Sequence, residues 1–530
     1  MIRHRWSGLP AVAILLAALV LALQIGSGAY HCETIVDESS HYVSGLMLHD
    51  YVLSGLTRSP LDYIRIWHAH YPLVGIGHWP PFYYLVEAAW MLAFSPTRTA
   101  MLLLSACVTL ATALLLYASL ARRAGRPPAA VAAGIFVAAP LAQAGTQMLM
   151  LDVPTALACL LAMLAYVRYL DRPRARDAAL FAGLAVVAMM VKGNGACLAL
   201  LPPCAVLIGR RFDLLRRASF WLPLPIAGVL ASPWYLLTYG RAAASFRFAW
   251  GLDFVALAAT SNLGYLRDSL GLPIVLLAAA GFIDVAARPA RAGGIAVGAA
   301  ALFASVWIFQ TVVPAGLQDR YLAPALPPLL ILAAHALAAI LERLAPLRVR
   351  APLSAGVLGL AFLLTSAELV RKQHSGMLEA AEQLFAHPVP GNPAVLISAD
   401  ELEESQAIME IALRDTDRPN LFAVRGSRLL GGGGYDAQEY RPRFDTVAKV
   451  MAAIDAESIP LVLVGGGDRC DWEHVCQVRA AATAYPERWH LLGRADVTGT
   501  APGLLYRIVG NDTRPAGTAS LLALSAPHGL

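Results

Sequence analysis

The chain has 530 residues, of which 58% are hydrophobic and only 15% are charged, and its mean hydropathy is +0.57. Soluble domains carry about 25% charged residues, so this composition excludes an ordinary soluble protein and favours a membrane protein. The net charge is only +5, and the arginines occur in short clusters between apolar runs. Because they form no continuous basic stripe, we interpret them as topology signals and expect no nucleic-acid partner.

The first apolar run, at 10–29, follows Arg3 and Arg5. It holds about 20 residues, whereas the core of a cleaved signal peptide holds roughly 7–15, so we interpret it as a retained signal anchor. Further apolar runs follow, and the sequence predicts a polytopic α-helical membrane protein with about 11–13 spans, several of them short. These runs lie at 81–94, 100–120, 129–147, 153–170, 178–191, 195–209, 219–239, 269–287, 293–313, 321–341 and 352–370.

Short arginine-rich segments predict the orientation, because cytoplasmic loops are enriched in Lys and Arg. These segments lie at 122–126, 172–176, 210–217, 288–291 and 343–350. Placing them in the cytoplasm with the N-terminus puts Asp37, Asp152, Lys192, Arg320 and a predicted loop at 240–268 outside. An odd number of candidate spans precedes Arg122. Either 81–94 does not fully cross or one span is missed, and the sequence leaves both open.

The chain changes character after the last apolar run, so we divide it into a transmembrane domain at 1–370 and a second domain at 371–530. The second part gains charge and holds β-like segments at 394–398, 421–424, 461–464 and 504–508, with helical stretches between them. This alternation predicts a small α/β domain, and the charge pattern places it outside the cytoplasm. From about 511 the tail is rich in Gly, Ala, Ser and Pro, and we expect it to be poorly ordered.

Two of the seven cysteines, Cys470 and Cys476, flank a short polar segment of this second domain. In an oxidising compartment they are candidates for a disulfide. A zinc site is the weaker alternative, because His474 and two cysteines do not complete a familiar ligand set, and free thiols are a third. We therefore predict no metal site.

Two polar motifs near the N-terminus contain candidate catalytic or binding residues. Asp37 and Glu38 follow the first span, where carboxylates are costly to desolvate. They are either part of a site, solvated loop acids, or caps of a helix that begins near Ser39. The second motif, at 78–84, reads His-Trp-Pro-Pro-Phe-Tyr-Tyr, and its two prolines also suit the first turn of a helix.

Three more charged residues interrupt apolar sequence on the predicted outer side. Asp152 lies beside Pro154 at a hinge between two spans, where it is either functional or a helix N-cap. Lys192 is followed by Gly193 and either binds an anion or reaches toward the interface. Arg320 either binds a phosphate through two parallel hydrogen bonds from its planar guanidinium group or pairs with its neighbour, Asp319.

These motifs, in this order over residues 10–370, resemble the GT-C membrane glycosyltransferases. The resemblance is closest to the branch that holds protein O-mannosyltransferases and the lipid A aminoarabinose transferase. The segment that begins at His78 is similar to the mannosyltransferase form His-Phe-Pro-Pro, with Trp79 in place of the aromatic residue. The lysine of the aminoarabinose branch is absent. Asp37 matches an acidic residue that relatives require at the exit of the first span, and Lys192 and Arg320 resemble family turns.

The resemblance implies a GT-C fold and an enzyme that moves a sugar from a polyprenyl-phosphate donor, with inversion, to an acceptor hydroxyl on a protein, a glycan or a lipopolysaccharide. It implies a bacterial inner membrane protein whose active site and C-terminal domain are periplasmic. No cofactor is certain, and a divalent metal is left open. The residues expected to act are Asp37, Glu38 and Asp152 in catalysis, Lys192, Arg320 and His78 at the donor phosphate, and Trp79, Tyr83 and Tyr84 in an acceptor or lipid groove.

Two other classes of function are weighed against this one. A transporter or flippase of lipid-linked cell-envelope intermediates is the main alternative, although such proteins show repeat symmetry that the sequence lacks. A scaffolding subunit of an envelope complex is the other, but it would not need acids, cations and aromatic residues on one side. The glycine runs at 431–434 and 465–467 lack the spacing of nucleotide-binding loops.

Overall fold

The structure is a computed structural model, and it describes residues 9–30, 36–244, 248–372, 376–390, 393–432, 440–465, 470–495 and 503–511. The predicted tail beyond 511 lies outside the described residues. The chain divides into two compact units. The first holds 1–27, 76–83 and 102–371, and the second holds 28–75, 84–101 and 372–530.

The first unit is helical. Its elements are α1 (Leu9–Gly26), α5 (Arg98–Ala121, from Leu102 on), α6 (Arg126–Ala138), α7 (Pro140–Thr146), α8 (Asp152–Asp171), α9 (Ala175–Val191), η2 (Gly193–Leu200), α10 (Leu201–Gly209), η3 (Phe212–Arg216), α11 (Ala218–Trp221), α12 (Pro223–Leu230), α13 (Ser232–Ala244), α14 (Leu252–Leu270), α15 (Leu272–Ala287), α16 (Pro289–Ala292), α17 (Gly294–Val312), η4 (Asp319–Ala325), α18 (Leu326–Leu344) and α19 (Leu347–Thr365).

Six of these helices among the described residues are long and apolar enough to cross a membrane: α1, α5, α8, α17, η4 with α18, and α19. The number rises to at most nine if each of three bent pairs is one span. The remaining apolar runs that the sequence predicts also coincide with helices, but those helices are shorter or bent. The chain is therefore an integral membrane protein with a mostly helical fold, as predicted.

The predicted loop at 240–268 is wrong for most of its length, because α14 covers 252–270. Its sequence mixes apolar residues with polar ones such as Asp253, which is exposed, and Asn262, which is buried, and an apolar-run criterion overlooks such an amphipathic helix. Gly271 then joins α14 to α15 at a bend of 114°. Its φ is 82°, and a Cβ there would lie 1.9 Å from the Thr365 hydroxyl oxygen, so the bend requires glycine.

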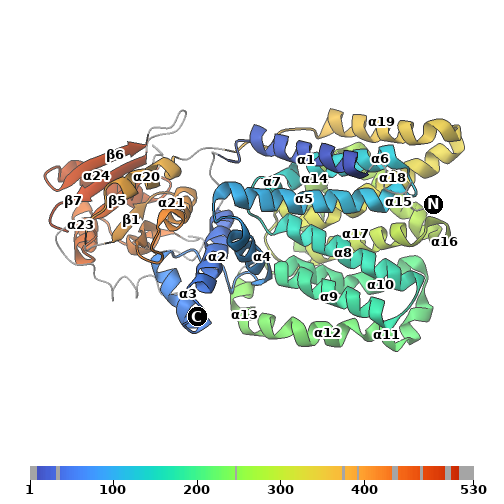
Figure 1. Cartoon of the computed structure of the whole chain (residues 1–530), viewed down its shortest axis with the longest axis horizontal. Helices are drawn as coiled ribbons and strands as arrows, with labels where there is room; N and C mark the ends of the chain where they lie inside the picture. The colour runs from blue at the N-terminus through green and yellow to red at the C-terminus, as the bar shows by residue number, and fades with distance from the viewer. Residues whose placement is uncertain are drawn as a thin grey trace. The chain divides into compact units, whose positions relative to one another are not determined.

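Small residues allow close packing in the helical core. In Figure 1, α8 lies with α9 and α17 beside it. Gly298 of α17 meets α8 so closely that a Cβ would lie 2.5 Å from Val167. Gly281 of α15 likewise meets the backbone of α18 at Leu332. Small residues at such interfaces bring helix backbones together inside membranes.

The second unit combines helices with a mixed sheet. Its helices are α2 (Val36–Leu53), α3 (Pro60–His70), α4 (Phe82–Ala93, from Tyr84 on), α20 (Met377–Ala386), α21 (Glu401–Arg414), α22 (Gly426–Leu429), α23 (Val447–Ala456) and α24 (Glu473–Ala484). Its strands are β1 (Ala394–Ser398), β2 (Phe422–Arg425), β3 (Gly431–Gly432), β4 (Arg441–Pro442), β5 (Leu461–Val464), β6 (Trp489–Ala495) and β7 (Gly503–Ile508).

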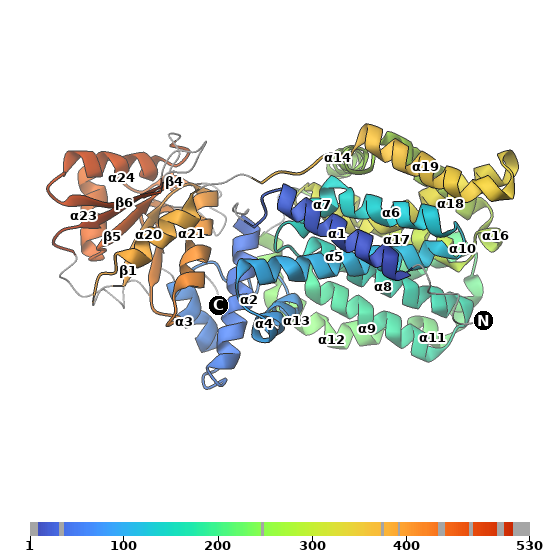
Figure 2. The same cartoon turned by 45° about the horizontal axis from the view of Figure 1, so that its top comes forward.

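Five strands form one sheet in the order β2-β1-β5-β7-β6. β1 pairs in parallel with β2 and β5, and β7 pairs antiparallel with β5 and β6. Every residue of β1 and β5 is buried, which explains their continuous Val, Leu and Ile. α24 packs on β1 and β5 (Figure 2). The prediction of an α/β region near the C-terminus is thereby confirmed.

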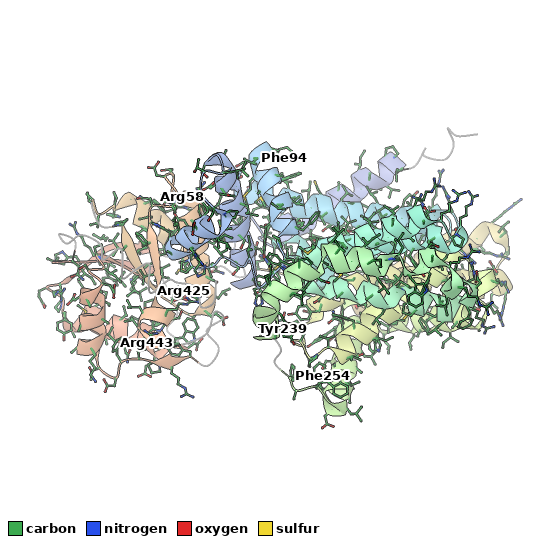
Figure 3. The ribbon with its side chains drawn as sticks, turned by 90° about the horizontal axis from the view of Figure 1, so that it is seen from below. Arg58, Phe94, Tyr239, Phe254, Arg425 and Arg443 are labelled. Atoms are coloured by element: carbon green, nitrogen blue, oxygen red, sulfur yellow. A yellow bond between two sulfur atoms is a disulfide. The ribbon has the colours of Figure 1, made fainter. Side chains whose placement is uncertain are left out.

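Buried polar contacts fasten the helices of this unit to the sheet. Arg425, labelled in Figure 3, ends β2, and its Nε donates to Glu404 of α21 at 2.7 Å. The same carboxylate accepts from the hydroxyl of Ser427, also at 2.7 Å.

Cys470 and Cys476 are joined as a disulfide, with Cα atoms 5.6 Å apart.

Candidate active site

A buried ion pair joins two of the residues singled out from the sequence. Lys192 Nζ donates to Asp152 Oδ1 at 2.6 Å, and the two side chains are only 8% and 3% exposed. Asp152 is the first residue of α8, and Lys192 follows the last residue of α9. The structure therefore brings together residues that are 40 apart in the sequence.

The glycines after Lys192 explain how the chain turns at this point. α9 ends at Val191, Lys192 is extended, and the chain returns along α9 as the 3-10 helix η2. A Cβ on Gly195 would lie 2.3 Å from the carbonyl carbon of Ala188, so the return fits only glycine there. This turn holds Lys192 beside the first residue of α8.

An aromatic ring links this ion pair to the second candidate cation. Lys192 Nζ lies 4.7 Å from the centroid of the Tyr321 ring, and the guanidinium carbon of Arg320 lies 5.7 Å from the same centroid. Arg320 Nε donates to Gln318 at 2.6 Å. Asp319 accepts from the backbone N–H of Arg320 at 2.7 Å. Two cations thus lie near one tyrosine ring, and one of them is paired with the buried carboxylate of Asp152.

The second oxygen of Asp152 has no hydrogen-bond partner in the part of the chain that the structure describes. Oδ2 is buried, and burying an acceptor without a partner is costly. The N-cap of α8 is Leu151, so the alternative of Asp152 as an N-cap does not describe its position. Oδ2 therefore remains an unused hydrogen-bond acceptor among the described residues.

The segment that begins at His78 leads into α4. His78 is exposed, and its ring meets the half-buried Trp79 edge-on, with centroids 4.4 Å apart. The backbone N–H of Gly77 donates to the carbonyl of Trp79, and α4 begins directly after Pro81. His78 and Trp79 belong to the helical unit, as does the buried Tyr83.

The acidic pair of Asp37 and Glu38 lies in the second unit, in the first turn of α2. Asp37 is half-buried. Glu38 is buried and its Oε2 lies 3.3 Å from Nζ of Lys372, whose side chain is only 5% exposed. The sequence reasoning missed Lys372, although a basic residue directly after the last span was a signal. The two carboxylates thus have different surroundings within one helical turn.

The buried residues of α2 include several polar side chains. His41 Nδ1 and the hydroxyl of Tyr84 are hydrogen-bonded at 2.8 Å, and both side chains are buried. Ser44 accepts from the backbone N–H of Gly75 at 2.8 Å. These hydrogen bonds stabilise the part of α2 that follows its first turn.

The described residues contain no group of three or more His, Cys, Asp or Glu side chains that could hold a metal ion. They therefore supply no ready protein ligand set for a divalent metal.

One stretch of the chain, which lies mostly in the helical unit, matches a known family. Residues 78–236 match the family model described as dolichyl-phosphate-mannose-protein mannosyltransferase. This stretch begins at His78 and includes Asp152 and Lys192. No curated protein matches the sequence.

Solved structures match over nearly the whole chain. ArnT from Cupriavidus metallidurans in the apo state has a TM-score of 0.61 at 15% identity, covering 95% of this chain and 98% of that one. The same protein bound to undecaprenyl phosphate has a TM-score of 0.56, covering 95% and 99%. The oligosaccharyltransferase AglB from Archaeoglobus fulgidus, in complex with an inhibitory peptide and a dolichol-phosphate, has a TM-score of 0.55 at 12% identity, covering 95% and 74%.

Another structure of the Archaeoglobus fulgidus enzyme is a complex with Zn and sulfate, at a TM-score of 0.53 and 14% identity, covering 85% of this chain and 67% of that one. At these identities the likeness establishes the fold. The chain therefore has the GT-C fold of membrane glycosyltransferases, and its residues 78–236 carry the pattern of the mannosyltransferase family model.

Proposed function

We propose that this protein is a glycosyltransferase that moves a sugar from a polyprenyl-phosphate donor to an acceptor hydroxyl group, with inversion at the anomeric carbon. The observation that carries the proposal is the cluster of Asp152, Lys192, Arg320 and Tyr321, which places two cations and a buried carboxylate together. The two cations can bind the negative charge of a lipid phosphate, and the carboxylate can accept hydrogen bonds from the hydroxyl groups of a sugar.

The comparisons support this class of donor. ArnT was solved with undecaprenyl phosphate and AglB with a dolichol-phosphate, which are both polyprenyl phosphates. The family description also names a dolichyl-phosphate sugar and a protein acceptor. We carry the donor class to this chain and leave the acceptor as a protein, a glycan or a lipopolysaccharide.

Lys192 and Arg320 would bind the donor phosphate, with His78 as a further donor of hydrogen bonds. The leaving phosphate gains negative charge as the bond to the sugar breaks. Cations held beside it therefore stabilise the transition state more than the ground state. Oδ2 of Asp152 would accept from a sugar hydroxyl while Oδ1 keeps Lys192 oriented.

Asp37 would act as the general base. It takes the proton of the acceptor hydroxyl, the acceptor oxygen bonds to the anomeric carbon, and the bond between that carbon and the phosphate oxygen breaks. The bonding electrons leave with the polyprenyl phosphate. Glu38, through its ion pair with Lys372, would hold the first turn of α2 in place and thereby orient the side chain of Asp37.

Aromatic side chains would line the remaining surface of the site. Trp79 and Tyr83 are apolar enough to contact a polyprenyl chain or the acceptor. Tyr84, which is hydrogen-bonded to His41, is a further candidate for this role. We further propose that the site and the C-terminal domain lie on the periplasmic face of a bacterial inner membrane, because the arginine-rich turns mark the opposite side.

The test is a transfer assay with purified protein and a panel of polyprenyl-phosphate sugars. Asp37→Asn should reduce turnover by about 100-fold or more, the scale of lost general-base catalysis. Asp253→Asn is the matched control, because Asp253 is also the second residue of its helix and is exposed. That variant should keep normal turnover.

Transfer at a normal rate by Asp37→Asn would remove Asp37 from the mechanism. Absence of transfer from every polyprenyl-phosphate donor, with the protein folded, would contradict the proposed reaction. Translocation of intact donor across a vesicle without transfer would instead support a flippase.

A further inference from the structure

A cavity lined by arginines and apolar side chains lies in the helical unit, at the end of α8 that is remote from Asp152. The cavity measures about 1060 Å³. Its lining includes Arg168 and Asp171 from the last turn of α8. Because a helix rises about 1.5 Å per residue, Arg168 lies about 24 Å along α8 from Asp152. The cavity is therefore separate from the candidate active site.

The ends of several membrane-spanning helices form this cavity. Its lining comes from the start of α1 and α17, the end of α5 and α8, and the middle of α18. A cavity at the ends of spanning helices lies at the depth of lipid headgroups. At that depth the headgroups of the surrounding phospholipids lie next to the protein.

The exposed charged residues of its lining are mostly positive, and the rest of the lining is mostly apolar. Four arginines and one aspartate line it: Arg122, Arg123, Arg126, Arg168 and Asp171. The apolar lining includes Leu120, Leu164, Val167, Ile295 and Ile331. A ligand that fits both parts is anionic at one end and hydrocarbon at the other.

Some of these charges already have partners. Arg123 NH2 donates to the backbone carbonyl of Arg291 at 2.6 Å. Arg168 lies 3.2 Å from Asp177, and His335 of the lining lies 3.0 Å from Asp284. Arg122, by contrast, is exposed and makes no polar contact with the described residues. Even with these pairs, the arginines that line the cavity outnumber the acid that lines it.

We propose that this cavity binds an anionic phospholipid, with the phosphodiester headgroup between Arg122 and Arg126 and an acyl chain along the apolar walls. Arginine binds phosphate through two parallel hydrogen bonds, which suits a headgroup. The positive-inside rule places this end of the helices in the cytoplasmic leaflet, where anionic lipids attract basic side chains. The site stands apart from sugar transfer and needs no donor or acceptor.

Native mass spectrometry of the full chain in detergent tests the proposal. Phosphatidylglycerol should bind at least about tenfold more tightly than phosphatidylcholine, which has the same chains and no net charge. The double variant Arg122→Gln/Arg126→Gln should weaken phosphatidylglycerol binding roughly thirtyfold. The double variant Arg216→Gln/Arg217→Gln is the control, because both arginines are exposed in another arginine-rich turn and do not line the cavity. It should bind normally.

A third variant tests the apolar part without changing charge. Ala338 lines the cavity, and Ala338→Trp should fill it and weaken the lipid by about tenfold. Equal binding of both lipids, or an equal loss in the control, would overturn the proposal. Unchanged binding by Ala338→Trp, or displacement of the lipid by inorganic phosphate, would also overturn it, because the acyl chain would then contribute nothing.

Discussion

The buried pair of Asp152 and Lys192 allows stability and catalysis to be separated. With both side chains less than a tenth exposed, removing one partner leaves the other as an uncompensated buried charge. Breaking such a pair costs about 3–5 kcal/mol. Asp152→Asn and Lys192→Met should therefore each lower stability by that amount.

The double variant should lose less than the sum of the two single variants. Since neither charge remains, the coupling should be about 2–3 kcal/mol. The turnover of the double variant should not recover along with its stability, because the donor phosphate would still lack the positive charge of Lys192. We expect it to stay about 100-fold below the wild type. Unfolding of detergent-solubilised protein and transfer kinetics on all three variants measure the two effects.

A surface pair provides the control. Arg291 and Glu342 lie 3.0 Å apart with side chains 65% and 50% exposed, so Glu342→Gln should cost less than about 1 kcal/mol. If the stability losses of the two single variants simply add up in the double variant, the interpretation of Asp152 and Lys192 as a buried ion pair is refuted. Full recovery of turnover in the double variant would refute the phosphate role of Lys192 and leave the pair purely structural.

Three further outcomes follow from the structure. Arg320→Ala should lower the catalytic constant, and Arg320→Lys should restore it only partly because the planar fork is lost, whereas a change in melting temperature alone would contradict the phosphate role. Glu38→Gln should destabilise the fold by about 3–5 kcal/mol, because Lys372 stays buried, and a melting curve identical to the wild type would refute their pairing. Burial lowers the pKa of His474 to about 4. The unfolded chain, with a pKa near 6.5, takes up a proton first as the pH falls, so stability is full above about pH 6.5 and falls by up to about 3 kcal/mol toward pH 4. His474→Gln should flatten that part of a melting-temperature profile, and an unchanged slope would contradict the assignment.

Apolar runs made most of the helical fold predictable. A membrane span must satisfy its backbone polar groups internally, so a long apolar run of this length can only be a helix. Helix α14 escaped this reasoning because its apolar face alternates with residues such as Asn262. The parallel strands β1 and β5 were predictable because both faces are buried, whereas β6, with His490 and Arg494, carries no comparable apolar signal.

The candidate site was predictable as a set of residue types but not as contacts. The order of Asp37, Asp152, Lys192 and Arg320 along the chain suggested one chemical class. The pairing of Asp152 with Lys192 depends on how α8 and α9 pack, which no local pattern encodes. Tyr321 was visible in the sequence only as the neighbour of Arg320, and its place beneath both cations comes from η4.

A structure of the protein with a bound polyprenyl phosphate would show directly whether Lys192 and Arg320 bind the donor. We expect the phosphate oxygens to lie within hydrogen-bond distance of Arg320 and Lys192, about 2.7–3.0 Å from their nitrogens. Binding measured alongside should weaken in Arg320→Ala. A phosphate bound elsewhere in the protein, with Arg320→Ala binding normally, would contradict the proposed donor site.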